Sequence, residues 1–132
     1  MDQFIKKIIK GNSILPPSVC MDSLKSNFDN AINIDWYKKD EYYEAIFYKE
    51  NIEHIALFGN EGNLIEYRQY LPDEFLPETI KSMLKSYGEI MNFVRKNKGN
   101  TIEYEVIIKD STNIRYMMVI SELGNICEKT KL

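Results

Sequence analysis

Apolar and polar side chains alternate along most of this chain, and the pattern changes to a helical spacing at three places. The helical spacing predicts an N-terminal helix over residues 2–10 and two further helices over residues 17–28 and 77–87. Pro17 and Pro77 open the last two, and proline suits the first turn of a helix. The apolar stripe of the first helix consists of Phe4, Ile5, Ile8 and Ile9, with lysines on the opposite side.

Eight runs of alternating residues, rich in aromatic and β-branched side chains, predict β-strands. They cover residues 32–39, 42–49, 54–59, 64–71, 90–96, 101–109, 113–121 and 125–132. Residues 60–63, Asn-Glu-Gly-Asn, form a hairpin signal in which Gly62 can adopt a positive φ. The run Pro-Asp-Glu-Phe-Leu before Pro77 is the one conspicuous linker.

The two halves of the chain carry the same features in the same order. The prolines that open the two helices are 60 residues apart, and the sequence YEAIF (43–47) recurs as YEVII (104–108) at a spacing of 61. EGNLIE (61–66) recurs as LGNICE (123–128) at a spacing of 62. An ordered series of matches at nearly constant spacing indicates an internal duplication.

We therefore predict an α+β protein made of two tandem α-β4 units that form one antiparallel sheet. The expected segments are a helical extension (1–15), a first repeat (16–71), a linker (72–76) and a second repeat (77–132). One short helix is too small to cover a four-stranded face, so two units together build a better core.

The first repeat resembles the PepSY-like, β-lactamase-inhibitor-protein-like repeat: a helix, a strand with a tryptophan, a YEAxF strand and a D/N-x-G-x-L hairpin. The residues that carry the resemblance are Trp36, Tyr43, Glu44, Ala45, Phe47, Asn60, Gly62 and Leu64. In the second repeat, Arg95 stands where we align Trp36, and Ile108 replaces the phenylalanine. The resemblance implies a tandem α-β4 fold with helices on one face of the sheet and an open, often concave, other face. It also implies an exported bacterial protein.

Strand alternation assigns the side chains to the two faces of the sheet. The predicted helix-covered positions are Tyr43, Ala45, Phe47, Ala56, Phe58, Tyr104, Val106, Ile108, Met117 and Val119. The other face then carries many aromatic and aliphatic side chains, which makes it a candidate contact patch. The predicted partner-binding residues are Tyr42, Ile46, Tyr48, Ile55, Leu57, Ile107, Tyr116 and Met118.

Three interpretations of this patch are open at the level of sequence. It contacts a partner, or it is covered within the chain by the N-terminal helix or by the linker. The third is that the faces are misassigned, because a slip of one residue turns every side chain of a strand to the other face.

Charge and hydropathy exclude several classes of protein. The formal net charge is −3 and the pI is about 5.3, which argues against a general nucleic-acid binder. No apolar run approaches the roughly 20 residues of a membrane span, so we expect no membrane insertion. The sequence shows no secretory signal, so we expect a cytoplasmic chain or, as the resemblance implies, a mature periplasmic one.

No motif of an enzyme or a cofactor site is present, and we predict no catalytic residue, metal or cofactor. His54 is the only histidine, and we interpret it as structural or surface-exposed. Cys20 and Cys127 lack the spacing of metal ligands. We expect two buried free thiols, or a disulfide if the fold brings their Cα atoms within about 7 Å.

The function that fits these observations is a non-catalytic module that binds an unidentified protein or peptide with the open sheet face. It could act as an inhibitor or as an accessory to exported proteins. The main alternative is self-association as a homodimer through the same face. A carrier of a small ligand in a pocket between the repeats is the weakest alternative.

Overall fold

The computed structural model describes residues 13–132. The helix predicted over residues 2–10, and most of the extension 1–15, lie outside this range. The first half contains α2 (Ser18–Asn27), β1 (Ile32–Lys39), β2 (Tyr42–Lys49), β3 (Ile52–Phe58) and β4 (Leu64–Gln69). The second half contains the 3-10 turn η1 (Asp73–Phe75), α3 (Glu78–Leu84), β5 (Glu89–Lys98), β6 (Thr101–Lys109), β7 (Arg115–Ser121) and β8 (Ile126–Lys131).

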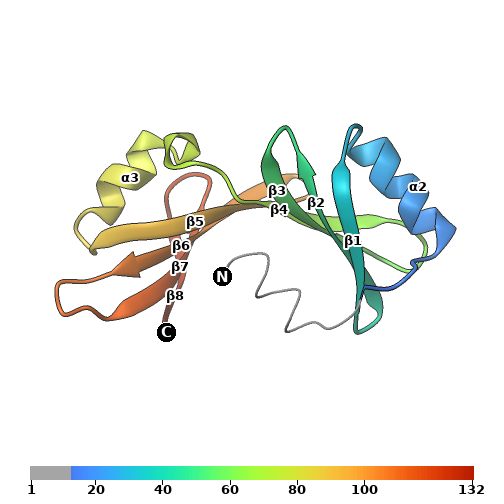
Figure 1. The fold of residues 1–132 in the computed structure, drawn as a ribbon. Coiled ribbons are helices and arrows are strands. Elements are labelled where there is room, and N and C mark those ends of the chain that lie inside the picture. Colours follow the sequence, from blue (N-terminus) through green and yellow to red (C-terminus); the bar gives the residue numbers. More distant parts are fainter. Residues whose placement is uncertain (1–12) are drawn as a thin grey trace. The chain divides into compact units, whose positions relative to one another are not determined.

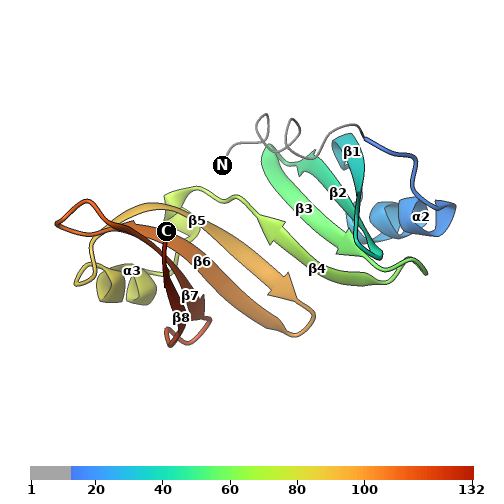
Figure 2. The same ribbon diagram turned by 90° about the horizontal axis from the view of Figure 1, so that it is seen from below.

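The strands hydrogen-bond in the order of the sequence, β1 to β8, in an eight-stranded sheet, which confirms the predicted α+β class. The chain divides into two compact units, and the division falls inside β4, between Tyr67 and Arg68. In each unit the described helix packs on one face of its strands (Figures 1 and 2). We call these the α2 face and the α3 face, and the opposite sides the far face of unit 1 and the far face of unit 2.

The core of unit 1 lies between α2 and its strands. Cys20, Leu24 and Phe28 from the helix and its end are buried against the sheet. The sheet side of this cluster consists of Trp36, Ala45, Phe47, Ala56 and Phe58, with Tyr43, Leu64 and Tyr67 packed at its margin. The predicted α2-face positions of the first repeat are therefore confirmed.

The register of unit 1 follows from the antiparallel pairing, in which directly opposite residues share a face. Ala45 lies opposite Trp36 on one side and Ala56 on the other, so all three belong to the α2 face. Glu50 and Asn51 both have positive φ in the tight turn between β2 and β3, as a two-residue hairpin requires.

The core of unit 2 is built in the same way. Tyr104, Val106 and Ile108 of β6 are buried, as are Ile80 and Leu84 of α3. These three sheet positions were predicted for the helix-covered face, and they are confirmed.

The register of β7 corrects the other two predicted core positions of the second repeat. Tyr104 lies opposite Ile120 and Val106 lies opposite Met118. Met117 and Val119 therefore lie on the far face, and their assignment to the helix-covered core was wrong. The physical reason is the turn after β6. Four residues separate Tyr48 from its partner Glu53, whereas five separate Lys109 from its partner Arg115.

The backbone hydrogen bonds support the internal duplication. The amides of Cys20 and Met21 donate to the Pro17 carbonyl, and the amides of Ile80 and Lys81 donate to the Pro77 carbonyl. The turn after β3 and the turn after β7 share a second pattern. Gly59 N donates to Asn63 O and Gly62 N to Gly59 O, while Ser121 N donates to Asn125 O and Gly124 N to Ser121 O.

The counterpart of Trp36 is Phe93, and the alignment of Trp36 with Arg95 was wrong. Trp36 lies opposite Ala45, and Phe93 lies opposite Val106, the residue that matches Ala45 in the repeat. Both strands carry an irregularity just before this position, between Ile32 and Asp35 in β1 and between Ile90 and Asn92 in β5. An aromatic side chain therefore fills the same core position in each unit.

Candidate partner-binding site

The far face of unit 1 carries a mixed apolar and acidic surface. Pairing places Asp35 opposite Ile46 and Ile46 opposite Ile55, so these three share the face. The set of residues on this face is Asp35, Tyr37, Lys39, Tyr42, Glu44, Ile46, Tyr48, Glu53, Ile55 and Leu57. Tyr48 Oη donates to Glu53 Oε2 at 3.3 Å, and Lys39 Nζ lies 3.9 Å from Glu44 Oε2.

The centre of this face is closed. Ile46 is only 1% exposed and Ile55 only 6%. Tyr37 and Glu44 are buried as well, whereas Tyr48 and Leu57 are half-buried. Of the predicted binding residues in unit 1, only Tyr42 is an exposed side chain, at 41%.

The far face of unit 2 has the same layout, and most of its residues are half-buried. Ile107 lies opposite Met117, Glu105 lies opposite Val94, and all four are half-buried. Val119, opposite Glu105, is buried at 8% exposure. We call Val94, Ile107 and Met117, which are apolar and half-buried, the apolar group of this face.

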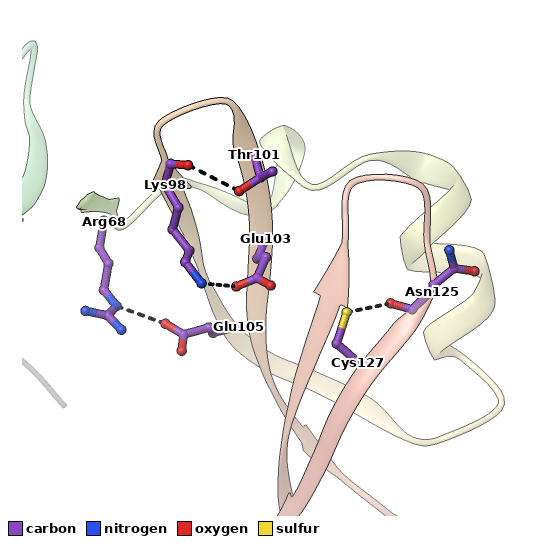
Figure 3. Close-up of polar contacts among 7 residues, drawn as sticks. All are labelled: Arg68, Lys98, Thr101, Glu103, Glu105, Asn125 and Cys127. Atoms are coloured by element: carbon purple, nitrogen blue, oxygen red, sulfur yellow. Dashed lines mark hydrogen bonds and ion pairs between the residues drawn. The ribbon is translucent and has the colours of Figure 1, made fainter. Parts of the chain in front are cut away.

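Two ion pairs involve acidic residues of the same face, and Figure 3 draws their side chains. Arg68 Nε donates to Glu105 Oε1 at 2.9 Å, and Lys98 Nζ lies 3.8 Å from Glu103 Oε1. Both ion pairs keep substantial solvent exposure, so their contribution to stability is small, roughly 0–1 kcal/mol.

The structure places the eight predicted binding residues on three different faces. Tyr42, Ile46, Tyr48, Ile55 and Leu57 share the far face of unit 1, and Ile107 lies on the far face of unit 2. Tyr116 and Met118 lie on the α3 face, opposite Ile108 and Val106. Their placement on the open face was wrong, for the same one-residue reason that affects Met117 and Val119.

The contacts around Tyr116 confirm this correction. Lys129 Nζ lies 4.6 Å from the Tyr116 ring centroid and 5.4 Å from that of Tyr87, which follows α3. Met118 is fully buried.

Sequence reasoning missed Val94 and Met117 as far-face residues. The signal for Met117 was present, because the Gly-Asn turns of the two repeats are 62 residues apart. A spacing of 62 applied to β7 aligns Met117 with Ile55 and Met118 with Ala56. No comparable signal located Val94, because the extra residue in β5 is visible only in the register.

His54 is a buried core residue. Its ring stacks on Phe47 with a centroid distance of 5.2 Å and an interplanar angle of 20°, and it contacts Phe28 and Tyr67 on the α2 face. Nδ1 lies 2.9 Å from the carbonyl oxygen of Ile52. The structural interpretation of His54 therefore agrees with its position.

The two cysteines are both free thiols, and their surroundings differ. Cys20 is buried, and its Sγ donates to Gly59 O at 3.4 Å. Burial raises the pKa of the Cys20 thiol. Cys127 is exposed on β8, so the expectation of two buried thiols was wrong for this residue, which lies on an edge strand.

Within residues 13–132, no group of three or more histidine, cysteine, aspartate or glutamate side chains is placed to hold a metal ion.

Two exposed aspartates have a pKa below the usual range. A hydrogen bond and the charge of Lys49 lower the pKa of Asp29, and hydrogen bonds from Thr112 and Ile114 lower that of Asp110. No helix in this range is both long and apolar enough for a membrane span.

Several solved structures share the architecture of this chain. A BLIP-like protein from Bacteroides fragilis superposes with a TM-score of 0.80 at 21% identity, covering 90% of this chain and 88% of that one. A DUF2874 family protein from Bacteroides uniformis gives 0.81 at 14% identity, covering 89% and 90%. The chain has a BLIP-like fold.

The likeness concerns the fold, because the sequence identities are low. A third structure with a BLIP-like fold, from Bacteroides eggerthii, is described as a candidate periplasmic protein; its TM-score is 0.81 at 14% identity, covering 89% of this chain and 90% of that one. No family model matches the chain, and no curated protein matches it significantly. The similarity therefore supports the predicted resemblance at the level of architecture.

Proposed function

We propose that this chain is a non-catalytic binding module that recognises a protein partner through the far face of unit 2. The observation that carries the proposal is the half-buried apolar group formed by Val94, Ile107 and Met117, which keeps part of its surface accessible to solvent. Solvent-accessible apolar clusters rimmed by charge are typical of protein contact sites. Methionine suits such a surface because its flexible, polarisable side chain adapts to a partner.

The surroundings of this group favour a protein over a small ligand. The partly exposed ion pairs Arg68–Glu105 and Lys98–Glu103 lie beside and between these apolar side chains, and protein interfaces usually combine apolar with charged and polar side chains. A sheet face offers a broad surface, whereas small-ligand sites are concave and enclose most of the ligand.

The non-catalytic part of the proposal is supported by the position of the single histidine. His54 is enclosed by the rings of Phe28, Phe47 and Tyr67 rather than placed on a surface. A general acid or base must reach a substrate within hydrogen-bond distance, and this imidazole is packed in a core.

Affinity capture with matched variants tests the proposal. The tagged chain and the variants Ile107→Lys and Met117→Lys are incubated with a lysate of the source cells, and the captured proteins are quantified by mass spectrometry. We expect a protein that is retained in fixed proportion by the original chain and lost with both variants. The control is Leu123→Lys, an identical change of character at a turn residue that is 90% exposed.

Two outcomes would contradict the proposal. Equal capture by the far-face variants and the control would show that this face does not hold the partner. Concentration-dependent dimerisation in sedimentation, abolished by Ile107→Lys and Met117→Lys alone, would favour self-association through the same face instead.

Export to the periplasm is the compartment that we propose for this module. The support is the shared BLIP-like fold with a candidate periplasmic protein. Fractionation of the source cells into periplasm and cytoplasm, followed by immunodetection, tests it. Recovery of the chain in the cytoplasmic fraction would contradict this part.

A further inference from the structure

The sheet ends on two edge strands, β1 and β8, whose outer sides differ. At β1, Ile14 N donates to Trp36 O at 2.9 Å, so part of the outer backbone is already bonded. Asn33 has a positive φ in the irregular part of β1, and such an irregularity interrupts the row of outer backbone groups. Among the described strands, β8 pairs with β7 alone, and all six of its residues are exposed. We call the side of β8 that points away from β7 the β8 edge.

The β8 edge presents a regular row of backbone groups. Leu132 N donates to Arg115 O at 2.9 Å, so Leu132 bonds inward to β7. Bonded residues alternate along an antiparallel strand, so Thr130 also bonds inward, and the amides and carbonyls of Lys129 and Lys131 point away from β7. An extended segment that adds to a sheet pairs with such a row.

The side chains of this row are positively charged on one face of the sheet. Lys129 lies opposite Met118 and Lys131 lies opposite Tyr116, so both lysines belong to the α3 face. The Lys129 ammonium lies 4.6 Å from the ring centroid of Tyr116 and 5.4 Å from that of Tyr87. These cation–π contacts favour its position on the α3 face. A strand added at the β8 edge would therefore place alternate side chains beside two cations.

The charges of β8 disfavour a second copy of this chain as the added strand. Two β8 strands related by a two-fold axis would pair antiparallel, with the residue at the axis opposite itself. An axis at Glu128 would oppose two glutamates, and an axis at Lys129 would oppose two lysines. An axis at Thr130 would oppose Lys129 to Lys131. Like charges directly opposite each other destabilise a strand pair.

An acidic strand fits the same edge. Lysines on an edge strand commonly discourage unselective strand pairing. A carboxylate opposite Lys129 and another opposite Lys131 would convert this repulsion into attraction, because opposite charges stabilise a cross-strand pair. On the other face of β8, Thr130 Oγ1 donates to Glu128 Oε1 at 3.1 Å, so the acid of this strand already has a partner.

We propose that the β8 edge binds an extended acidic segment of a partner protein as an added strand. The segment carries aspartate or glutamate at alternate positions, beside Lys129 and Lys131 on the α3 face. Its backbone bonds to the outward amides and carbonyls of these two lysines. Main-chain hydrogen bonds supply the affinity, and the alternate carboxylates select the segment. The inference does not depend on the proposed use of the far face of unit 2.

Amide hydrogen exchange of the full chain, followed by NMR, tests the proposal. The probe is a synthetic peptide of alternating threonine and glutamate, and the control peptide alternates threonine and lysine. We expect the glutamate peptide to slow exchange of the Lys129 and Lys131 amides severalfold. The Thr130 amide, which bonds inward, should change much less. The lysine peptide should leave all three amides unchanged.

Two variants separate backbone pairing from charge. Lys131→Pro removes one outward N–H without removing a bond to β7, and it should weaken binding of the glutamate peptide. Lys129→Glu/Lys131→Glu should lose the glutamate peptide and gain the lysine peptide. Protection of the Thr130 amide reports whether β8 still pairs with β7 in each variant. If either variant loses this pairing, the comparison of the two peptides on the unchanged chain decides.

Three outcomes would overturn the proposal. The first is unchanged exchange at Lys129 and Lys131 in the presence of the glutamate peptide. The second is equal protection by the two peptides, which would show that charge does not select the segment. The third is protection that rises with the concentration of the chain alone, which would show that a second copy occupies the β8 edge.

Discussion

The two units of this chain share one design on their helix-covered faces and differ on their far faces. The α2 face and the α3 face place equivalent residues in equivalent positions, down to an aromatic ring at Trp36 and at Phe93. The far faces differ in the exposure of equivalent residues, since Ile46 is buried while Ile107 is half-buried. The two units are therefore alike on their helix-covered faces and differ on their far faces.

This comparison separates the faces that form the two cores from the faces that do not. A helix-covered face must satisfy its own core, so its residues are constrained by volume and apolarity. A far face is constrained only by what covers it. At the centre of the far face of unit 1, Ile46 and Ile55 are buried, whereas the equivalent Ile107 and Met117 of unit 2 are half-buried.

The largest effect on stability should come from a charge introduced on the α3 face of β7. Met118→Lys places an uncompensated ammonium in the fully buried α3 face and should lower the free energy of unfolding by about 3–5 kcal/mol. Met117→Lys, one residue away on the half-exposed far face, should cost less than about 1 kcal/mol. Urea denaturation measures both free energies of unfolding. Equal losses for the two variants would contradict the assignment of Met117 and Met118 to opposite faces of β7.

Truncation of the equivalent helix residues should have the next largest effect. Leu24 of α2 and Leu84 of α3 are both buried under their helices. Leu24→Ala and Leu84→Ala should each lower the free energy of unfolding by about 2–5 kcal/mol, through lost burial and a residual cavity. Thermal and urea unfolding should give similar losses for the two variants, and a tenfold weaker effect at one site would break the equivalence of the units.

A smaller effect should separate the equivalent turn glycines. Gly62 and Gly124 both have a positive φ, of 88° and 93°. A Cβ on Gly62 would lie 2.7 Å from the Val19 carbonyl oxygen, while a Cβ on Gly124 meets nothing within 4 Å. Gly124→Ala should cost about 1 kcal/mol for the backbone conformation alone, and Gly62→Ala clearly more. If differential scanning calorimetry gave the same loss for both, the close approach of α2 to its turn would be contradicted.

The smallest effect should come from the turn that carries the extra residue of unit 2. Asp110 Oδ1 accepts hydrogen bonds from Thr112 N, Thr112 Oγ1 and Ile114 N. These bonds lower the pKa of Asp110 in the folded state, with the Thr112 side chain as the main cause. The stabilisation is therefore complete above the unfolded pKa of about 3.9 and is lost as the pH falls through the lower folded pKa.

Asp110→Ala should accordingly lower the unfolding temperature slightly at neutral pH and have no effect at a pH below both values. Thermal unfolding of the variant and the unchanged chain across this range measures the difference. A difference that grows on acidification would contradict the assignment of this turn.

Much of the fold could be predicted from the sequence, because core packing leaves a periodic record. The alternation in YEAIF and YEVII located β2 and β6, and the matched prolines located the starts of α2 and α3. The faces of unit 1 were correct because the turn between β2 and β3 contains only two residues, Glu50 and Asn51, which fixes the register.

The candidate site was predicted only in part, for two physical reasons. The longer turn at Asp110 shifts β7 by one residue, and a one-residue shift exchanges Met117 with Met118 between faces. The closed state of the far face of unit 1 could not be predicted either. Alternation records which side of a strand a residue is on, but not what lies above it.

The most direct test of this account is the accessibility of Ile46 and Ile107 in the unchanged chain. Hydroxyl-radical footprinting, with each residue normalised to its modification in the unfolded protein, compares two isoleucines at equivalent positions of the repeat. The account predicts clearly faster modification of Ile107 than of Ile46, which should be almost fully protected. Equal modification of the two residues would contradict it, because the far faces would then be either both accessible or both covered.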